Sequence, residues 1–185
     1  GTLRYLFELY GMEIFHVTRI PTHGGSIRVY AARRGDYPVD QSVGDLLDAE
    51  PPLLVQKYKL QMMGKHAIPV SKMALHRLLC PHKLAGRKIV GVGAPSRATT
   101  LINYVGLDAN IIDYVCELEG SLKIGTVVPG TQIPIVDEKR LFEEQPEVAI
   151  IFSWHIAKEI ASNLRKKGYK GTLVTPLPIP RVISP

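Results

Sequence analysis

The residues whose types and spacing best suit ligand binding lie in one glycine-containing segment, residues 88–103. An apolar run that favours a β-strand meets Gly91 and Gly93, and a helical pattern then follows and ends at Gly106. A strand, a glycine turn and a helix together present free backbone N–H groups to a phosphate in doubly wound folds. The segment therefore predicts an anion-binding turn, with Ser96 as the N-cap of the helix.

This segment matches the dinucleotide-binding fingerprint only in part. The pattern G-x-G-x-x-G places a third glycine where this chain has Ser96, and Pro95 removes one N–H donor from the turn. A strand-to-helix turn that binds no ligand is the alternative interpretation. The missing glycine also disfavours a dinucleotide enzyme that transfers hydride.

Two further sets of polar or aromatic residues are expected at the same edge of the predicted sheet. Ligands bind at the carboxyl ends of strands in open parallel sheets. Glu117 follows the predicted strand 111–115 and is placed to bind a ribose hydroxyl, or it is a solvent-exposed residue at a loop start. Trp154 and His155 follow the predicted strand 148–152, where the indole is either a ligand platform or a core residue.

Two more candidates lie near the N-terminus. His23 stands beside two glycines between predicted strands and could serve as a general base if a partner and a substrate are positioned there. A turn histidine bonded to nearby backbone is the simpler alternative. Arg28 is suited to bidentate binding of a phosphate, or it faces solvent.

The pattern from residue 85 onward predicts the scaffold that would position these groups. Strands alternate with helices over short connections, which indicates an α/β fold: a Rossmann-like parallel sheet with helices on both faces. The prolines after residue 175 predict no further regular structure. The expected strands are 88–92, 111–115, 133–136, 148–152 and 172–175, and the expected helices are 97–105, 138–144 and 156–167.

The part before residue 85 has a different character. Residues 1–37 are predicted to form an amphipathic helix over residues 3 to 10 and two strands over residues 12–20 and 27–32. We interpret this unit as the remnant of a larger domain. Residues 38–84 are predicted to form a helical connector. Its first helix is N-capped by Ser42, and two further helices cover 53–63 and 71–79. Residues 85–185 are predicted to form the last domain. Two strands cannot bury both faces alone, so they are expected to pack on the connector or to form a homodimer.

Composition narrows the class of protein. The chain has 185 residues and a formal charge of +6, which favours anionic partners or is only a solvated basic surface. No nucleic-acid motif, signal peptide or membrane-length apolar run is present, so a cytoplasmic protein without nucleic-acid or membrane partners is expected. Cys80 and Cys116 lack zinc-type spacing and are expected to be buried small hydrophobes.

Four ordered blocks resemble the C-terminal domain of S-adenosylmethionine-dependent C-methyltransferases that act on nucleotide-linked deoxysugars. The first is Thr22-His-Gly-Gly-Ser-Ile-Arg-Val-Tyr30, and the second runs from Gly91 through Ala-Pro-Ser-Arg to Thr100-Leu-Ile-Asn-Tyr104. The third is Lys123-Ile-Gly…Pro129-Gly-Thr-Gln-Ile-Pro-Ile135, and the fourth is Trp154-His155 with Glu159-Ile160.

The resemblance implies that this chain is a fragment that helps to hold a nucleotide-diphosphate keto-deoxysugar and does not turn over alone. His23 is then the only catalytic candidate, and the S-adenosylmethionine site and a zinc domain would lie outside this chain. A non-catalytic Rossmann-type nucleotide-binding or interaction module is the alternative. The substrate-binding residues implied are Arg28, Gly91, Gly93, Ala94, Pro95, Ser96, Thr99, Thr100, Asn103, Glu117, Lys123, Trp154 and His155.

Two departures from the family pattern concern the substrate. His155 stands where the family typically has Asn, and the segment Cys116-Glu117-Leu118-Glu119 replaces one that usually carries Asp. The sugar that is bound is therefore left open by the resemblance.

Overall fold

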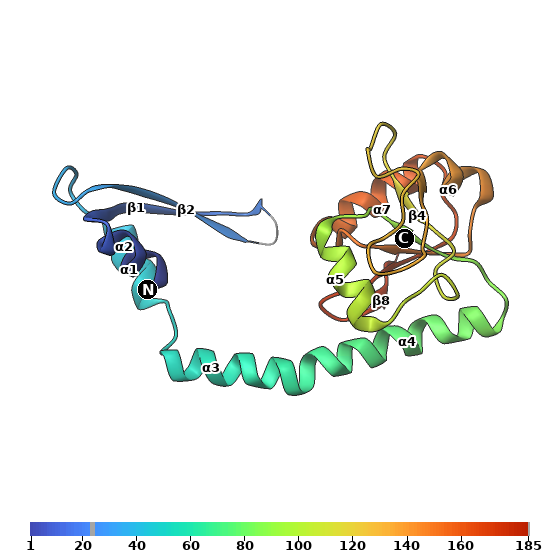
Figure 1. Cartoon of the computed structure of the whole chain (residues 1–185), viewed down its shortest axis with the longest axis horizontal. Helices are drawn as coiled ribbons and strands as arrows, with labels where there is room; N and C mark the ends of the chain where they lie inside the picture. Colours follow the sequence, from blue (N-terminus) through green and yellow to red (C-terminus); the bar gives the residue numbers. More distant parts are fainter. Residues whose placement is uncertain (23–24, 185) are drawn as a thin grey trace. The chain divides into compact units, whose positions relative to one another are not determined.

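The chain forms two compact units in the computed structural model, which describes residues 1–22 and 25–184 (Figure 1). One unit comprises Gly1–Met63 and the other Gly64–Pro185. Within the described residues, no helix is both long enough and apolar enough to span a bilayer.

The first unit is a β-hairpin covered by helices. Strands β1 (Met12–Ile20) and β2 (Ser26–Arg33) pair antiparallel, and helices α1 (Thr2–Leu9) and α2 (Gln41–Asp48) pack on β1. Ile14 and Val17 of β1 and Val43 of α2 form its small buried core. The expected packing of these strands on a connector helix is therefore present.

The N-cap of α2 differs from the prediction. Asp40 occupies the cap position, and its carboxylate accepts a hydrogen bond from the Ser42 N–H at 2.9 Å. The Ser42 hydroxyl instead accepts from the Val17 N–H at 3.1 Å, so it ties the helix to β1. Hydrogen bonds that the Asp40 carboxylate accepts from Ser42, from its side chain and then from its N–H, hold the pKa of that carboxyl below its ordinary value.

Three helical elements follow. They are α3 (Leu53–Met62), a π-helical turn (Met63–Ala67) and α4 (Ile68–Leu84). The prediction of a helix over 71–79 was too short. Pro81 lies inside the last turns of α4, where the helix continues despite the lost N–H donor. Leu75 and Leu79 of α4 are buried in the core of the second unit.

The second unit is built on a six-stranded sheet with the order β5-β4-β3-β6-β7-β8. All neighbouring strands are parallel except the edge pair β7 and β8, which is antiparallel. The strands are β3 (Ile89–Val92), β4 (Val115–Glu117), β5 (Ile135–Asp137), β6 (Val148–Ile151), β7 (Thr172–Thr175) and β8 (Arg181–Val182).

Helices cover both faces of this sheet, as predicted. Alternate residues of each strand point to opposite faces, so β3 sends Ile89 to one core and Val90 to the other. Helices α4 and α5 (Ser96–Val105) bury their apolar sides in the first core. Helices α6 (Lys139–Glu144) and α7 (Ala157–Lys166) bury theirs in the second.

The second strand of the sheet begins later than predicted. Residues 109–111 form a turn closed by N–H donation from Ile111 and Ile112 to the Asp108 carbonyl, residues 112–114 are irregular, and β4 starts at Val115. Ile112 is fully buried although it lies in the irregular segment before β4, which explains why the apolar run resembled a strand. Glu117 is consequently the last residue of β4 and does not follow it.

Two other expectations were wrong. The proline-rich end does contain regular structure, because β8 follows Pro178 and Pro180 and its residues keep their N–H donors at the edge of the sheet. Cys116 is buried as expected, and burial raises the pKa of its thiol to about 12. Cys80, by contrast, is exposed on α4.

Candidate functional site

The candidate site lies where strand order reverses in the sheet of the second unit. The chain goes from β3 outward to β4 on one side and returns to β6 on the other side. Such a switch point leaves a crevice at the carboxyl ends of the strands, which is where open α/β sheets bind ligands. The loop after β3 and the segment after β6 therefore border the same crevice.

The two glycines of the loop after β3 have different roles. Gly91 lies inside β3, where a Cβ atom would stand 2.5 Å from Phe152 Cε2 and 2.8 Å from Val115 Cγ2. It is therefore a packing position within the sheet. Gly93 has a φ of +79°, a conformation that L side chains rarely adopt, and it turns the chain out of the strand.

The start of helix α5 also differs from the prediction. Helix α5 begins at Ser96, and Pro95 occupies the N-cap position with an extended backbone, so Ser96 is not the N-cap. The fixed φ of proline suits the position just before the helix, which pushes serine into the first turn. Ser96 nevertheless lines the adjoining pocket.

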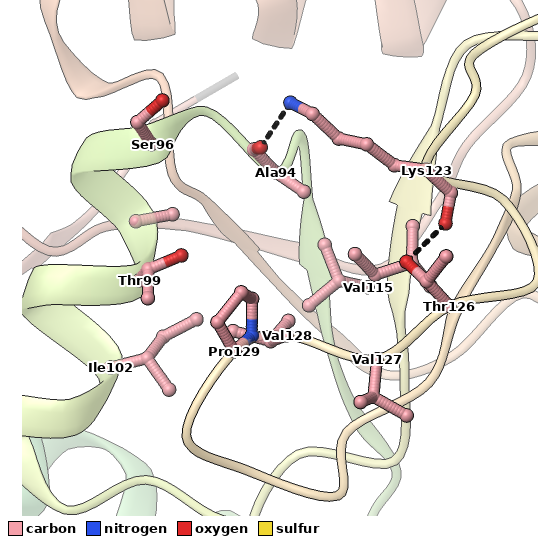
Figure 2. Close-up of a pocket in the computed structure, with 12 residues that line it drawn as sticks. Ala94, Ser96, Thr99, Ile102, Val115, Lys123, Thr126, Val127, Val128 and Pro129 are labelled. Atoms are coloured by element: carbon pink, nitrogen blue, oxygen red, sulfur yellow. Dashed lines mark hydrogen bonds between the residues drawn. The ribbon is translucent and has the colours of Figure 1, made fainter.

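A carboxylate and an ammonium clamp the loop after β3. Glu117 Oε1 accepts a hydrogen bond from the Ala94 N–H at 2.7 Å, and Lys123 Nζ donates to the Ala94 carbonyl at 2.6 Å (Figure 2). Lys123 Nζ lies 3.7 Å from the same Glu117 oxygen, and the Glu117 side chain is only 16% exposed. The carboxylate predicted to bind ribose therefore already holds the peptide of Ala94.

A pocket of about 370 Å³ opens beside this clamp, between α5 and the segment 123–129 (Figure 2). Its volume lies at the lower end of the range typical of small-molecule sites. Thr99 points from α5 into the space, with Ser96, Lys123 and Thr126 as the other polar residues. Its apolar lining comprises Ala94, Ala98, Ile102, Val115, Val127, Val128, Pro129 and Ile135.

Asn103 fixes the far side of the pocket. Its amide nitrogen donates to the Thr99 carbonyl at 2.8 Å and to the Pro129 carbonyl at 2.9 Å. A Cβ atom on Gly130 would collide with the Asn103 amide, so the glycine lets the two segments meet. In this structure both donors of Asn103 serve the backbone that shapes the pocket wall.

Trp154 and His155 meet the helix on the other side of the crevice. They form a short 3₁₀ helix after β6, and the Arg97 guanidinium lies 5.6 Å from the centre of the Trp154 ring. Arg97 Nη1 is 3.2 Å from His155 Nδ1. Because a guanidinium can only donate, Nδ1 is the acceptor, and the proton of the neutral imidazole lies on Nε2.

The remaining predicted residues are distributed as follows. Thr100 is exposed on α5 and is not among the described residues that line the pocket. Arg28 belongs to β2 in the first unit, opposite Thr18. His23 lies outside the residues that the structure describes.

Several residues of the site were missed from the sequence. Arg97 follows Ser96 directly, and a cation in the first turn after a glycine loop was a usable signal. Thr126 and Val127 line the pocket from a loop with no periodic pattern, so only its fold brings them to α5.

Two observations bear on cofactor and metal binding in the described part of the chain. Rossmann-type sites use a strand-end carboxylate for ribose, and here Glu117 is bound to Ala94 and lies near Lys123. Among residues 1–22 and 25–184, no three His, Cys, Asp or Glu side chains gather as metal ligands would.

Comparison with known proteins identifies the family to which this chain belongs. The model of the C-methyltransferase C-terminal domain matches residues 21–178. The chain belongs to this family. It is also 28% identical over 186 residues to C-methyltransferase NovU of Streptomyces niveus. That alignment covers 100% of this chain and 44% of the relative, so the chain spans less than half the length of the enzyme it matches. The resemblance found in the four sequence blocks is thus confirmed at the level of the family.

Proposed function

We propose that this chain is the nucleotide-sugar-binding part of an S-adenosylmethionine-dependent C-methyltransferase that acts on a nucleotide-diphosphate keto-deoxysugar. The observation that carries the proposal is the pocket between α5 and the segment 123–129, next to the N-terminus of α5 and lined by Ser96, Thr99 and Lys123. Membership in the C-methyltransferase family supplies the reaction class.

The chemistry of the pocket suits a nucleotide better than a methyl donor. The N-terminal end of α5 favours an anion, because free amides and the helix dipole both attract negative charge. Lys123 adds a cation at the rim, with its side chain 49% exposed. The apolar lining between α5 and the loop would cover a base or a sugar ring.

The crevice between Arg97 and the segment after β6 provides a second set of contacts for the same ligand. Arg97 is held against Trp154 and His155, so its guanidinium is fixed in place and pre-organised for a diphosphate. His155 stands where the family's usual residue is Asn, so an imidazole replaces an amide beside Arg97. We propose that this exchange selects among sugars.

The reaction requires groups beyond those described here. C-methylation beside a keto group needs a base that removes the proton and donors that stabilise the resulting enolate, whose carbon then attacks the methyl group of the donor. We assign the described residues to substrate binding, keep His23 as the candidate base, and place the donor site outside this chain. No turnover is expected from these 185 residues alone.

Calorimetry on the 185-residue chain tests the proposal. A thymidine-diphosphate sugar should bind and S-adenosylmethionine should not. Lys123→Met should weaken binding of the nucleotide by about tenfold, because a charged hydrogen-bonding group is lost from the rim. Lys139→Met, which removes an exposed ion pair with Glu119, is the matched control and should bind as the unmodified chain does. Binding of the methyl donor without the nucleotide would overturn the proposal.

The alternative is a nucleotide-binding module without a role in methyl transfer. The missing third glycine and the engaged Glu117 disfavour a dinucleotide in this crevice. Binding of NAD with an affinity equal to that of the thymidine-diphosphate sugar would favour the alternative.

A further inference from the structure

A second, larger cleft lies in the same unit, on the side of the sheet away from the pocket of Figure 2. Its volume is about 830 Å³, and it runs between α7 and the chain end that includes β8. Leu173, Ala157 and Ala161 contribute apolar surface, and Trp154 and His155 stand among its lining residues. Nothing in the sequence pattern had indicated this cleft, because β8 was not expected.

Positive charge gathers on both walls of this cleft. Lys158, Arg165 and Lys166 project from α7 at positions i, i+7 and i+8, which fall close together around the helix. Arg181 of β8 supplies a fourth cation from the opposite wall. No Asp or Glu is among the described residues that line it.

Three of these cations have N–H donors that no described carboxylate uses in an ion pair. Over residues 1–22 and 25–184, no carboxylate forms an ion pair with Lys158, Lys166 or Arg181, whereas the neighbouring Lys167 pairs with Glu138 at 2.6 Å. Arg165 differs because Nη1 donates to the Tyr169 carbonyl at 2.7 Å. Like charges around one cleft repel each other, and an anion seated among them removes that repulsion.

We infer that the cleft between α7 and β8 binds an organic phosphate, held by Lys158, Lys166 and Arg181. A bare phosphate ion would fill little of the volume, whereas the apolar floor and the Trp154 ring suit the organic part of a larger ligand. The phosphate belongs either to the diphosphate of a nucleotide or to a separate phosphorylated molecule. The inference stands on charge and shape alone and does not require the proposed function.

The position of the only tryptophan provides a direct test. The chain contains one Trp, residue 154, which lines the cleft and also contacts the Arg97 guanidinium. Its fluorescence therefore responds to an anion at either place, and the cleft variants assign the response to the cleft. Sodium pyrophosphate, added to the 185-residue chain at constant ionic strength, should give a saturable change. The double variant Lys166→Gln/Arg181→Gln should raise the dissociation constant by about tenfold or more.

Matched variants separate this cleft from the pocket beside α5. Lys170→Gln removes the same charge from an exposed position nearby that does not line the cleft, and it should leave the pyrophosphate titration unchanged. Lys123→Met, which tests the pocket beside α5, should change the dissociation constant for pyrophosphate less than the double variant does. Lys166, Arg181 and the control residue Lys170 are all exposed, so circular dichroism should show that the variants fold as the unmodified chain does.

Two results would overturn the inference: a fluorescence change that does not saturate, or equal dissociation constants for the double variant and Lys170→Gln. A second arm identifies the source of the phosphate. If thymidine diphosphate binds at least about tenfold more tightly than pyrophosphate, and the double variant loses that gain, the cleft holds the diphosphate of a nucleotide. Equal binding of the two ligands supports a site for a separate phosphorylated molecule.

Discussion

At the scale of single residues, Glu117 shows how one side chain can fix the backbone of a candidate site. Its carboxylate accepts the Ala94 N–H and lies near Lys123, so it fixes the loop after β3. Glu117→Ala should lower the free energy of unfolding by about 2 kcal/mol, because a half-buried N–H loses a charged acceptor. Glu117→Gln keeps an acceptor oxygen and should lose less than half as much. Urea unfolding of both variants measures this, and equal losses would contradict the assigned bond.

Gly91 makes a steric prediction. Gly91→Ala would place a methyl group against Phe152 and Val115 within the sheet, and overpacking of this kind costs about 1–3 kcal/mol. Gly44→Ala is the control, since Gly44 lies within α2 and a Cβ there meets only the flexible end of Gln41. That change should stabilise its helix by roughly 0.5–1 kcal/mol. Thermal melts with the same sign for both variants would be inconsistent with the packing at Gly91.

The sequence indicated residue types at the site better than their partners. Gly93, Thr99 and Lys123 stand near the crevice because strand, turn and helix follow one another locally. Glu117 accepts a hydrogen bond from Ala94, and Asn103 donates to Thr99 and Pro129. The bonds to Ala94 and Pro129 join segments that are distant in sequence. Side-chain direction across such distances has no signature in local periodicity.

At the scale of elements, Glu144 connects helix α6 to the start of the sheet. Its carboxylate accepts hydrogen bonds from Lys88 Nζ and Arg140 Nε, both at 2.7 Å, and these cations hold its pKa at about 2, below the ordinary 4.5. The native state thus favours the charged form. The stability that this preference provides is present above about pH 4.5 and is lost as the pH falls toward 2.

Glu144→Gln should therefore be less stable than the unmodified chain at pH 7, and the gap should close between pH 4.5 and 2. Urea unfolding at several pH values measures the gap. Glu143→Gln, at the exposed neighbouring position, is the control and should keep a nearly constant difference. A gap for Glu144→Gln that does not change with pH would show that its charge is not favoured by folding.

Elements were predicted well where the hydrophobic periodicity was unbroken, and poorly where apolar residues fill the core from outside a regular element. The strands 12–20 and 172–175 have the predicted bounds. The strand over 111–115 was misplaced because Ile112 fills the core from an irregular segment, and a hydrophobic pattern does not distinguish such a segment from a strand. The strand β8 was missed because an edge strand pairs on one side only, which tolerates neighbouring prolines.

At the scale of the whole molecule, association through the first unit stays a prediction. The β1–β2 hairpin is a two-stranded sheet, so both strands have an unpaired edge, and Ile27 is 40% exposed. Sedimentation should show a homodimer at micromolar concentration that Ile27→Lys disrupts. A chain that sediments as a monomer at every concentration would refute pairing through these strands.

Division into two units leads to the last prediction. The two large cores lie within residues 64–185, where α4 to α7 cover both faces of the sheet, and the pocket and the α7–β8 cleft are lined by residues of this unit alone. A fragment of residues 64–185 should therefore fold by itself, because its buried apolar surface does not depend on the hairpin. It should melt cooperatively and respond to pyrophosphate with the same dissociation constant as the 185-residue chain. If nucleotide-sugar binding is lost while pyrophosphate binding persists, binding of the sugar requires residues 1–63 and the cleft is independent of them. A fragment without a cooperative melt would show that residues 1–63 are needed for the fold of the second unit.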